Sequence, residues 1–195
     1  MSSDSNDGGG AEFTFLGEET LYEGYVMRVA KSRFADPDGG EFTRDIVYSP
    51  GAVGVVPVEI VDGVAMVTMV RQYRAPLRAT QLEIPAGLRD KPGEDVEAVG
   101  RRELIEEVGL IAGRMTLLTS FLNAAGMTDQ RTWLYLAQDL TPTEREADGA
   151  EEQWMTIEVH PLDELVEQLT TNDIGDGKTV IGLVLAQQEL RRQQQ

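Results

Sequence analysis

Three glutamates, Glu103, Glu106 and Glu107, crowd one stripe of a segment that is expected to be helical. Residues three and four positions apart are neighbours on a helix, and like charges there repel by roughly 0.2–0.5 kcal/mol per pair. The glutamates also fall in the last turns, where the helix dipole favours cations. A hard divalent cation such as Mg²⁺ or Mn²⁺ would remove this conflict, because it prefers carboxylate oxygens and carries the opposite charge. The stripe therefore predicts a metal site.

The helix that carries this stripe is predicted to run from Val96 to Val108. Asp95 is a favourable N-cap residue at the end of a Pro-Gly-Glu-Asp loop, and apolar residues follow at intervals of three or four. Gly109 is a natural stop, because glycine readily adopts the left-handed conformation that ends many helices. All three glutamates thus lie in the second half of one helix.

The same residues have an ordinary explanation as a solvated acidic face. Arg101 and Arg102 could neutralise their neighbours, and Arg102 with Glu106 would form an i, i+4 ion pair worth roughly 0.3 kcal/mol. Short acidic patterns also recur by chance. On this segment alone, the metal site and the solvated face both remain open.

The residues around the stripe carry a resemblance to a known family. Residues 87–110 resemble the Nudix box, whose pattern is G-x5-E-x7-R-E-U-x-E-E-x-G-U, with U a bulky aliphatic residue. From Glu94 onward the match is complete. Gly87 and Glu94 are separated by one residue more than the pattern has. The intervening loop contains Pro92 and Gly93 for turning, so the extra residue does not disturb the carboxylate stripe.

The resemblance extends to one branch of this family, the ADP-ribose pyrophosphatases, and covers most of the chain from Phe15 to Leu190. Five segments carry it: three that look like successive strands (49–56, 70–74 and 82–87), a loop with Thr and Gln where the branch has Ser and Glu (126–130), and the opening of the last helix (176–179).

This resemblance implies an α/β protein with the Nudix fold, an α/β/α sandwich around a mixed sheet, and a small N-terminal antiparallel β lobe. We expect residues 1–10 to be disordered, because they are rich in Ser, Asp and Gly. Residues 11–50 are expected to form the lobe, residues 51–190 the Nudix hydrolase domain, and residues 191–195 a flexible tail.

Local patterns predict individual elements. Tyr25, Met27 and Val29 alternate with polar neighbours as in a strand, and residues 36–40 are typical of a turn. Asp62-Gly63 between two apolar runs is a strong hairpin signal. Further strands are expected at residues 132–137 and 155–159, a C-terminal helix at residues 178–192 and a long irregular stretch at residues 141–153, with one helix on each side of the sheet.

The resemblance implies roles for the residues of the stripe and its surroundings. The backbone carbonyl of Ala86 would complete a metal shell formed by the three glutamates, which hold one or more Mg²⁺ ions, or Mn²⁺. Glu106, Glu107 and Arg102 are expected to be catalytic, with Arg102 orienting the glutamates. Glu151 or Glu152 would act as the general base or position the water, although adjacent glutamates in an acidic loop are more often solvated surface.

Four residues are candidates for substrate binding. Arg74 resembles the family arginine that contacts a substrate phosphate, because a planar guanidinium can hold two phosphate oxygens at once. Arg71 is a second candidate, although both arginines could be ordinary charged residues at a strand end. Leu88 and Asp129 lie in segments that match the family pattern.

Composition excludes several other classes of protein. The formal net charge of −17 argues against a basic surface for nucleic acid. The chain has no cysteine, which excludes disulfides and thiolate chemistry. No apolar run approaches the roughly 18 residues of a membrane span, and the first residues do not resemble a signal peptide. We therefore expect a cytoplasmic protein without membrane or nucleic-acid partners.

The expected activity is metal-dependent hydrolysis of ADP-ribose to AMP and ribose 5-phosphate. A homodimer in which the lobe supplies part of the adenosine pocket is also implied by the resemblance. Two alternatives remain: a Nudix pyrophosphatase for another nucleoside diphosphate sugar or dinucleotide, and a non-catalytic Nudix ligand-binding module. The physiological substrate, the phosphorus attacked and the number of metal ions stay open.

Overall fold

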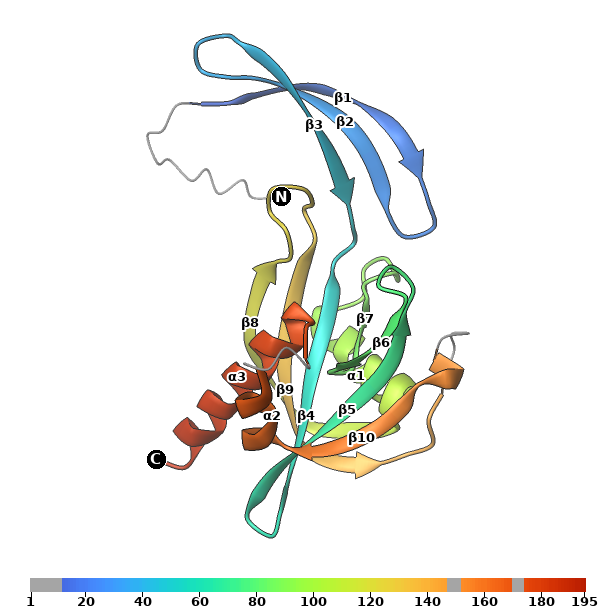
Figure 1. Cartoon of the computed structure of the whole chain (residues 1–195), viewed down its shortest axis with the longest axis vertical. Helices are drawn as coiled ribbons and strands as arrows, with labels where there is room; N and C mark the ends of the chain where they lie inside the picture. The colour runs from blue at the N-terminus through green and yellow to red at the C-terminus, as the bar shows by residue number, and fades with distance from the viewer. Residues whose placement is uncertain (1–11, 147–151, 170–173) are drawn as a thin grey trace. The chain divides into compact units, whose positions relative to one another are not determined.

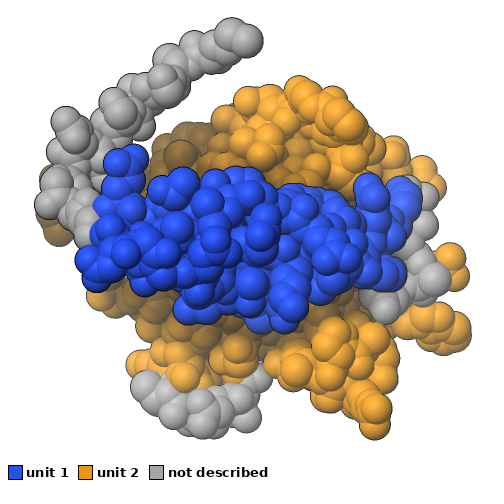
Figure 2. Space-filling model, turned by 90° about the horizontal axis from the view of Figure 1, so that it is seen from above, with its two compact units in different colours: residues 1–49, 124–129 blue, residues 50–123, 130–195 orange. Residues whose placement is uncertain are grey.

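The computed structural model describes residues 12–146, 152–169 and 174–195. The chain divides into two compact units, which Figure 2 colours separately. The first comprises residues 1–49 and 124–129, and the second comprises residues 50–123 and 130–195. The expected disordered segment, residues 1–10, lies outside the described residues. No helix in the described part of the chain is long and apolar enough to cross a membrane.

The first unit contains a three-stranded antiparallel sheet, as expected for the lobe. Its strands, in the order β1-β2-β3, are β1 (Thr14–Glu23), β2 (Arg28–Ala35) and β3 (Glu41–Tyr48). Phe34 stacks on Phe42 and contacts Phe15 on the neighbouring strand. Tyr25 and Met27 were expected in a strand, but β2 begins at Arg28. The amide of Gly24 donates to the carbonyl of Met27 and so closes a turn there.

The second unit is built on a seven-stranded sheet with the main order β10-β5-β4-β9-β8. β6 pairs with β5, and β7 pairs with β4. The β4–β9 pair is parallel and the other pairs are antiparallel, so the sheet is mixed as expected. The strands are β4 (Ala52–Val61), β5 (Val64–Arg74), β6 (Ala79–Glu83), β7 (Ala86–Leu88), β8 (Leu110–Leu122), β9 (Arg131–Pro142) and β10 (Thr156–Pro161).

Helices cover both faces of this sheet (Figure 1). α1 (Val96–Val108) buries Val99 and Leu104 in one core cluster, while α2 (Leu162–Gln168) and α3 (Gly177–Gln193) contribute to a second. A short 3₁₀ helix, η1 (Glu152–Trp154), precedes β10. Because the two clusters lie on opposite faces, the α/β/α sandwich is confirmed.

Elements with strong local signals agree with the sequence, and others differ. Asp62 and Gly63 have φ angles of 50° and 83° and form the predicted two-residue hairpin turn between β4 and β5. The strand β8 and the helix α2 were not predicted. The helix α3 runs from Gly177 to Gln193, one residue beyond each end of the helix expected at residues 178–192, and it takes in the first part of the expected tail, residues 191–195.

The ends of α1 agree with the prediction because both caps are local. The Asp95 side chain accepts hydrogen bonds from the amides of Glu97 and Ala98. At the other end Gly109 has φ 63° and ψ 42°, and its amide donates to the carbonyl of Ile105. These caps fix where the helix begins and ends, while buried Val99 and Leu104 turn the side that carries Glu103 and Glu107 inward.

Replacing Gly109 should test how much the C-terminal cap of α1 stabilises the fold. In Gly109→Ala the new Cβ would meet the carbonyl oxygen of Thr143 at 2.8 Å, and alanine disfavours the left-handed conformation by about 1–2 kcal/mol. We expect at least that loss in the free energy of unfolding, measured by urea denaturation. Gly177→Ala is the control, because its Cβ meets nothing within 4 Å. Equal stability of the two variants would contradict this account.

Candidate metal and phosphate site

Arg102 lies at the centre of the acidic stripe of α1. Its Nη1 is 2.6 Å from Oε2 of Glu106 and 2.7 Å from Oε1 of Glu103. Its Nε and Nη2 reach the carboxylate of Glu94, and Nη2 also donates to the carbonyl of Leu88 at 3.4 Å. The ion pair between Arg102 and Glu106, which the explanation as a solvated acidic face predicts, is therefore present. The same guanidinium also ties the helix to the loop before it.

The electrostatic balance at Arg102 favours its charged form. Burial works against the charge on the guanidinium, but the surrounding carboxylates, that of Glu103 foremost, outweigh burial and raise the pKa of Arg102 above its ordinary value. Arg102 therefore remains a cation, and it neutralises part of the repulsion within the stripe.

Glu103 and Glu107 turn inward against the short strand β7. Both residues are buried, with 6% and 4% of their surface exposed. Oε2 of Glu107 accepts a hydrogen bond from the Ala86 amide at 2.9 Å. A Cβ at Gly87 would overlap the carboxyl group of Glu103, so this carboxylate packs directly on the glycine backbone. Two carboxylates of α1 thus meet the chain at residues 86 and 87.

The donors in this region fit a hard divalent cation. Three carboxylates and the backbone carbonyl of Ala86 would offer only oxygen, which Mg²⁺ and Mn²⁺ prefer. As the side chains stand, no three acidic or histidine side chains in the described ranges are grouped closely enough to hold a metal ion. Arg102 draws Glu103 and Glu106 toward itself, while Glu107 turns to the Ala86 amide. Binding would therefore require the Arg102 pairs to loosen.

Arg74, at the end of β5, is held by a buried carboxylate. Its Nε and Nη2 donate to the two oxygens of Glu83 at 2.7 and 2.6 Å, which is a bidentate pair. The Glu83 side chain is only 2% exposed, whereas that of Arg74 is 36% exposed. The negative charge of Glu107 on α1 also helps to raise the pKa of Arg74. The arginine is therefore oriented by Glu83 and lies near the carboxylates of the stripe.

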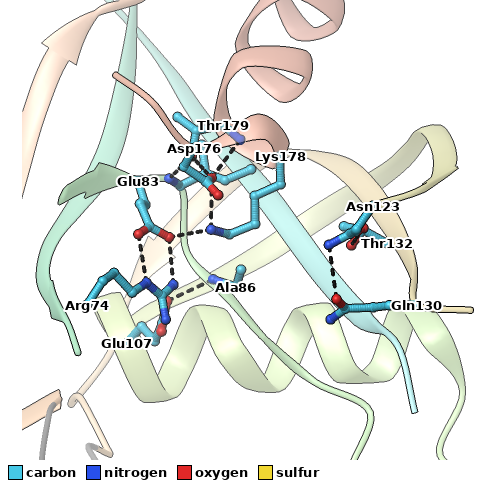
Figure 3. A network of polar contacts seen from close by, with 11 residues as sticks. Arg74, Glu83, Ala86, Glu107, Asn123, Gln130, Thr132, Asp176, Lys178 and Thr179 are labelled. Atoms are coloured by element: carbon cyan, nitrogen blue, oxygen red, sulfur yellow. Dashed lines mark hydrogen bonds and ion pairs between the residues drawn. The ribbon is translucent and has the colours of Figure 1, made fainter. Parts of the chain in front are cut away.

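The start of α3 completes this network, as Figure 3 shows. Nζ of Lys178 donates to Glu83 and, at 2.9 Å, to Asp176. Asp176 caps α3 by accepting from the Thr179 amide at 2.9 Å and from its hydroxyl at 2.6 Å. The amide of Ile84 donates to the Thr179 hydroxyl oxygen at 3.1 Å. The helix is thus joined to the strand end beside Glu83 and Arg74.

Arg71, the second arginine candidate for substrate binding, lies on the other face of β5 from Arg74. Side chains alternate along a strand, so residues three apart project from opposite faces of β5. Arg71 instead donates to Glu158 on β10, with Nε 2.5 Å from Oε1, and His160 lies 3.0 Å from the same carboxylate. Arg71 stays a proposed substrate contact, with Glu158 as its partner in this structure.

The remaining predicted residues belong to different elements. Asp129 belongs to the first unit, where its carboxylate accepts from the Ser49 amide at 3.0 Å. Leu88 ends β7, and its carbonyl accepts from Arg102. Glu151 lies outside the described residues. Glu152 opens η1, but its side chain lies outside the described part of the chain.

Sequence reasoning missed the residues that support Arg74. Glu83 and Lys178 stand in segments that matched the family pattern, yet no role was predicted for either. The available signals were a glutamate inside an apolar strand run and a lysine in the first turn of a helix. Both positions are unfavourable without a partner. Each could have indicated an ion pair, although the partner could not be named from sequence.

Comparison with known proteins agrees with this geometry. The model of the NUDIX domain family matches residues 49–181, which include the glutamate stripe, Arg74 and Lys178. The chain belongs to this family. It is therefore a Nudix hydrolase, an enzyme class that acts on pyrophosphate bonds and generally uses divalent metal ions.

Three known proteins are similar to this Nudix chain over most of its length. It is 34% identical to a methanol dehydrogenase activator of Bacillus methanolicus, with 85% of this chain and 87% of that protein covered. It is 32% identical to an ADP-ribose pyrophosphatase of Mycobacterium tuberculosis, with 89% and 82% covered. A crystal structure of an ADP compounds hydrolase superposes with a TM-score of 0.80 at 27% identity, covering 93% of this chain and 96% of that one.

The close approach of Glu103 to Gly87 yields a test of the metal site. In this Nudix chain Gly87→Ala should displace the Glu103 carboxylate and weaken Mn²⁺ binding by at least about tenfold. Calorimetric titration with Mn²⁺ measures the affinity. Gly126→Ala, whose Cβ meets nothing within 4 Å, is the matched control. Unchanged Mn²⁺ affinity in a folded Gly87→Ala protein would remove Glu103 from the proposed metal ligands.

Proposed function

We propose that the protein hydrolyses the pyrophosphate bond of ADP-ribose, giving AMP and ribose 5-phosphate, with Mg²⁺ as the metal and Mn²⁺ as a substitute. One observation carries this proposal: the segment of residues 83–87 contacts both Arg74, through Glu83, and two carboxylates of α1, through residues 86 and 87. The relative from Mycobacterium tuberculosis is named for the same reaction. A diphosphate requires both a cation and an oriented arginine, and this site offers both.

Glu103, Glu106 and Glu107, together with the Ala86 carbonyl, would hold the metal. When bound, the metal lowers the pKa of a coordinated water and neutralises charge on the diphosphate. Arg102 pairs with Glu103 and Glu106 in this structure; it would release part of these contacts when the metal binds and would stay beside the glutamates to orient them. The three carboxylates are thus assigned one task, with Glu106 and Glu107 close to the reacting water.

Arg74 would contact the diphosphate through the part of its guanidinium that Glu83 does not occupy. Two of its five N–H groups are used in the bidentate pair, and the side chain retains solvent access. An arginine already held by a carboxylate loses little side-chain freedom on binding. Glu151 or Glu152 would act as the general base or position the attacking water, and Arg71, Leu88 and Asp129 remain proposed substrate contacts.

A second candidate is hydrolysis of a different nucleoside diphosphate compound. The solved structure that resembles this chain is described as an ADP compounds hydrolase, a broader term than ADP-ribose. The metal and arginine parts of the site would be the same for such a substrate. A ligand-binding module without turnover is disfavoured, because every glutamate of the box pattern is present.

A substrate panel separates these candidates. With Mg²⁺, we expect kcat/KM for release of AMP from ADP-ribose to exceed the values for ADP-glucose, GDP-mannose and NADH by at least about tenfold. Product chromatography identifies AMP and ribose 5-phosphate. A higher kcat/KM for another compound would move the assignment to that substrate, and no turnover of any of them would favour a binding module.

Glu106→Gln tests the catalytic assignment with the same assay. Loss of one carboxylate ligand should lower kcat by at least about 100-fold while the fold remains intact, as circular dichroism would show. Glu97→Gln is the matched control and should keep normal activity, because Glu97 is a partly exposed glutamate on the same helix that pairs with Arg101. Near-normal turnover in Glu106→Gln would defeat the assignment.

We also propose a cytoplasmic homodimer that associates through the first unit and completes the adenosine pocket there. Exposed apolar side chains support this, because Phe15, Leu21 and Tyr22 each leave more than half of their surface exposed. Light scattering after gel filtration should give twice the chain mass of 21.4 kDa. Leu21→Asp should shift the mass toward one chain, while Val61→Asp on the exposed β4–β5 hairpin should not. A wild-type mass of one chain at micromolar concentration would exclude the dimer.

A further inference from the structure

Glu83 is a buried carboxylate shared between two cations. Its side chain is 2% exposed and accepts from Arg74 on β5 and from Lys178 on α3. Burial acts to raise the pKa of Glu83, but its pairs with these two cations outweigh burial and lower the pKa below its ordinary value. A buried charge is stable only when its partners remain in place. Glu83 therefore remains ionised because both cations contact it.

Lys178 occupies a position that is unfavourable for a cation. It stands in the first turn of the 17-residue helix α3, where the helix dipole favours anions, and its side chain is only 12% exposed. Asp176 offsets part of this charge from 2.9 Å, and Asp176 is itself engaged as the N-cap. Stability of the helix does not explain a buried lysine here, because a neutral or acidic residue would suit this turn better.

The division of charge around Glu83 decides what Arg74 can do. With Arg74 as its only partner, Glu83 would neutralise the guanidinium, and little attraction for a diphosphate would remain. With Lys178 also bound, the negative charge of Glu83 is shared between two cations, while Asp176 balances part of the charge of Lys178. Arg74 then keeps its orientation from the bidentate pair and retains part of its positive charge. Both properties are required of a phosphate-binding arginine.

We infer that Lys178 is a positioning residue for the reaction. It acts through Glu83, and it maintains Arg74 as an oriented, incompletely neutralised cation near the carboxylates of α1. This inference rests on the proposed function and deepens it, because it assigns a determinant of diphosphate affinity to the start of α3. Lys178 is not placed in contact with the substrate.

The experiment compares Lys178→Met, Lys178→Arg and Lys178→Gln with the wild-type enzyme. KM for ADP-ribose should rise by about tenfold in Lys178→Met, with kcat changed by less than about threefold. Lys178→Arg should restore most of the affinity, because it returns the positive charge to Glu83. Lys91→Met is the matched control, since Lys91 is exposed in the loop before α1. If Lys178→Met does not fold, Lys178→Gln, which can still hydrogen-bond to Glu83, takes its place.

A second measurement does not depend on turnover. The Nε–H resonance of Arg74, assigned by its loss in Arg74→Lys, should shift in Lys178→Met and not in Lys91→Met. A lowered melting temperature with unchanged KM and an unchanged resonance would overturn the inference and leave Lys178 a structural role. If wild-type enzyme does not hydrolyse ADP-ribose, the proposed substrate fails, while the Arg74 resonance still decides whether Lys178 controls the arginine.

Discussion

The contact between the last turns of α1 and residues 86–87 is the constraint on which the rest of this site depends. Glu107 accepts the Ala86 amide, and Glu103 packs against a glycine that has no Cβ to exclude it. This contact requires β7 to pair with β4 and α1 to cover the same face of the sheet. The mixed sheet therefore serves to hold one peptide segment against one helical stripe, and the carboxylates become usable for metal chemistry through that contact.

Two groups of charged side chains flank this contact, and they differ in their numbers of cations and carboxylates. On α1, one arginine faces several carboxylates, so Arg102 lowers the repulsion that the stripe would otherwise carry. Beside β6, two carboxylates face two cations: Glu83 is shared between Arg74 and Lys178, and Asp176 also pairs with Lys178. The carboxylates of α1, which suit a divalent cation, thus lie near Arg74, which suits a phosphate. A metal-bound diphosphate supplies a divalent cation for the carboxylates and phosphate oxygens for the arginine, which is why the arrangement fits that substrate class.

Features set by neighbouring residues could be predicted, and those set by distant ones could not. The bounds of α1 follow from Asp95 and Gly109, and the β4–β5 turn follows from Asp62-Gly63, because caps and turns are decided within a few positions. The strand β8 was not predicted although its partner β9 is the next strand along the chain, because the residues of β8 lack the regular alternation of buried and exposed positions that marks a strand. Arg71 and Arg74 look equivalent in sequence, yet alternation along β5 and different partners separate them.

The sequence by itself determined the glutamate stripe, its helix and the family to which the chain belongs, because these depend on residue type at short and regular spacing. Only the tertiary structure decided which charges meet. Glu83 and Lys178 are 95 positions apart, and so are Ile84 and Thr179, yet each pair forms a direct contact. Such pairs arise from the packing of α3 against the sheet, and no local pattern encodes that packing. The glutamates and Arg74 are therefore apparent from the chain, whereas the residues that hold Arg74 in place, Glu83 and Lys178, become apparent only in the fold.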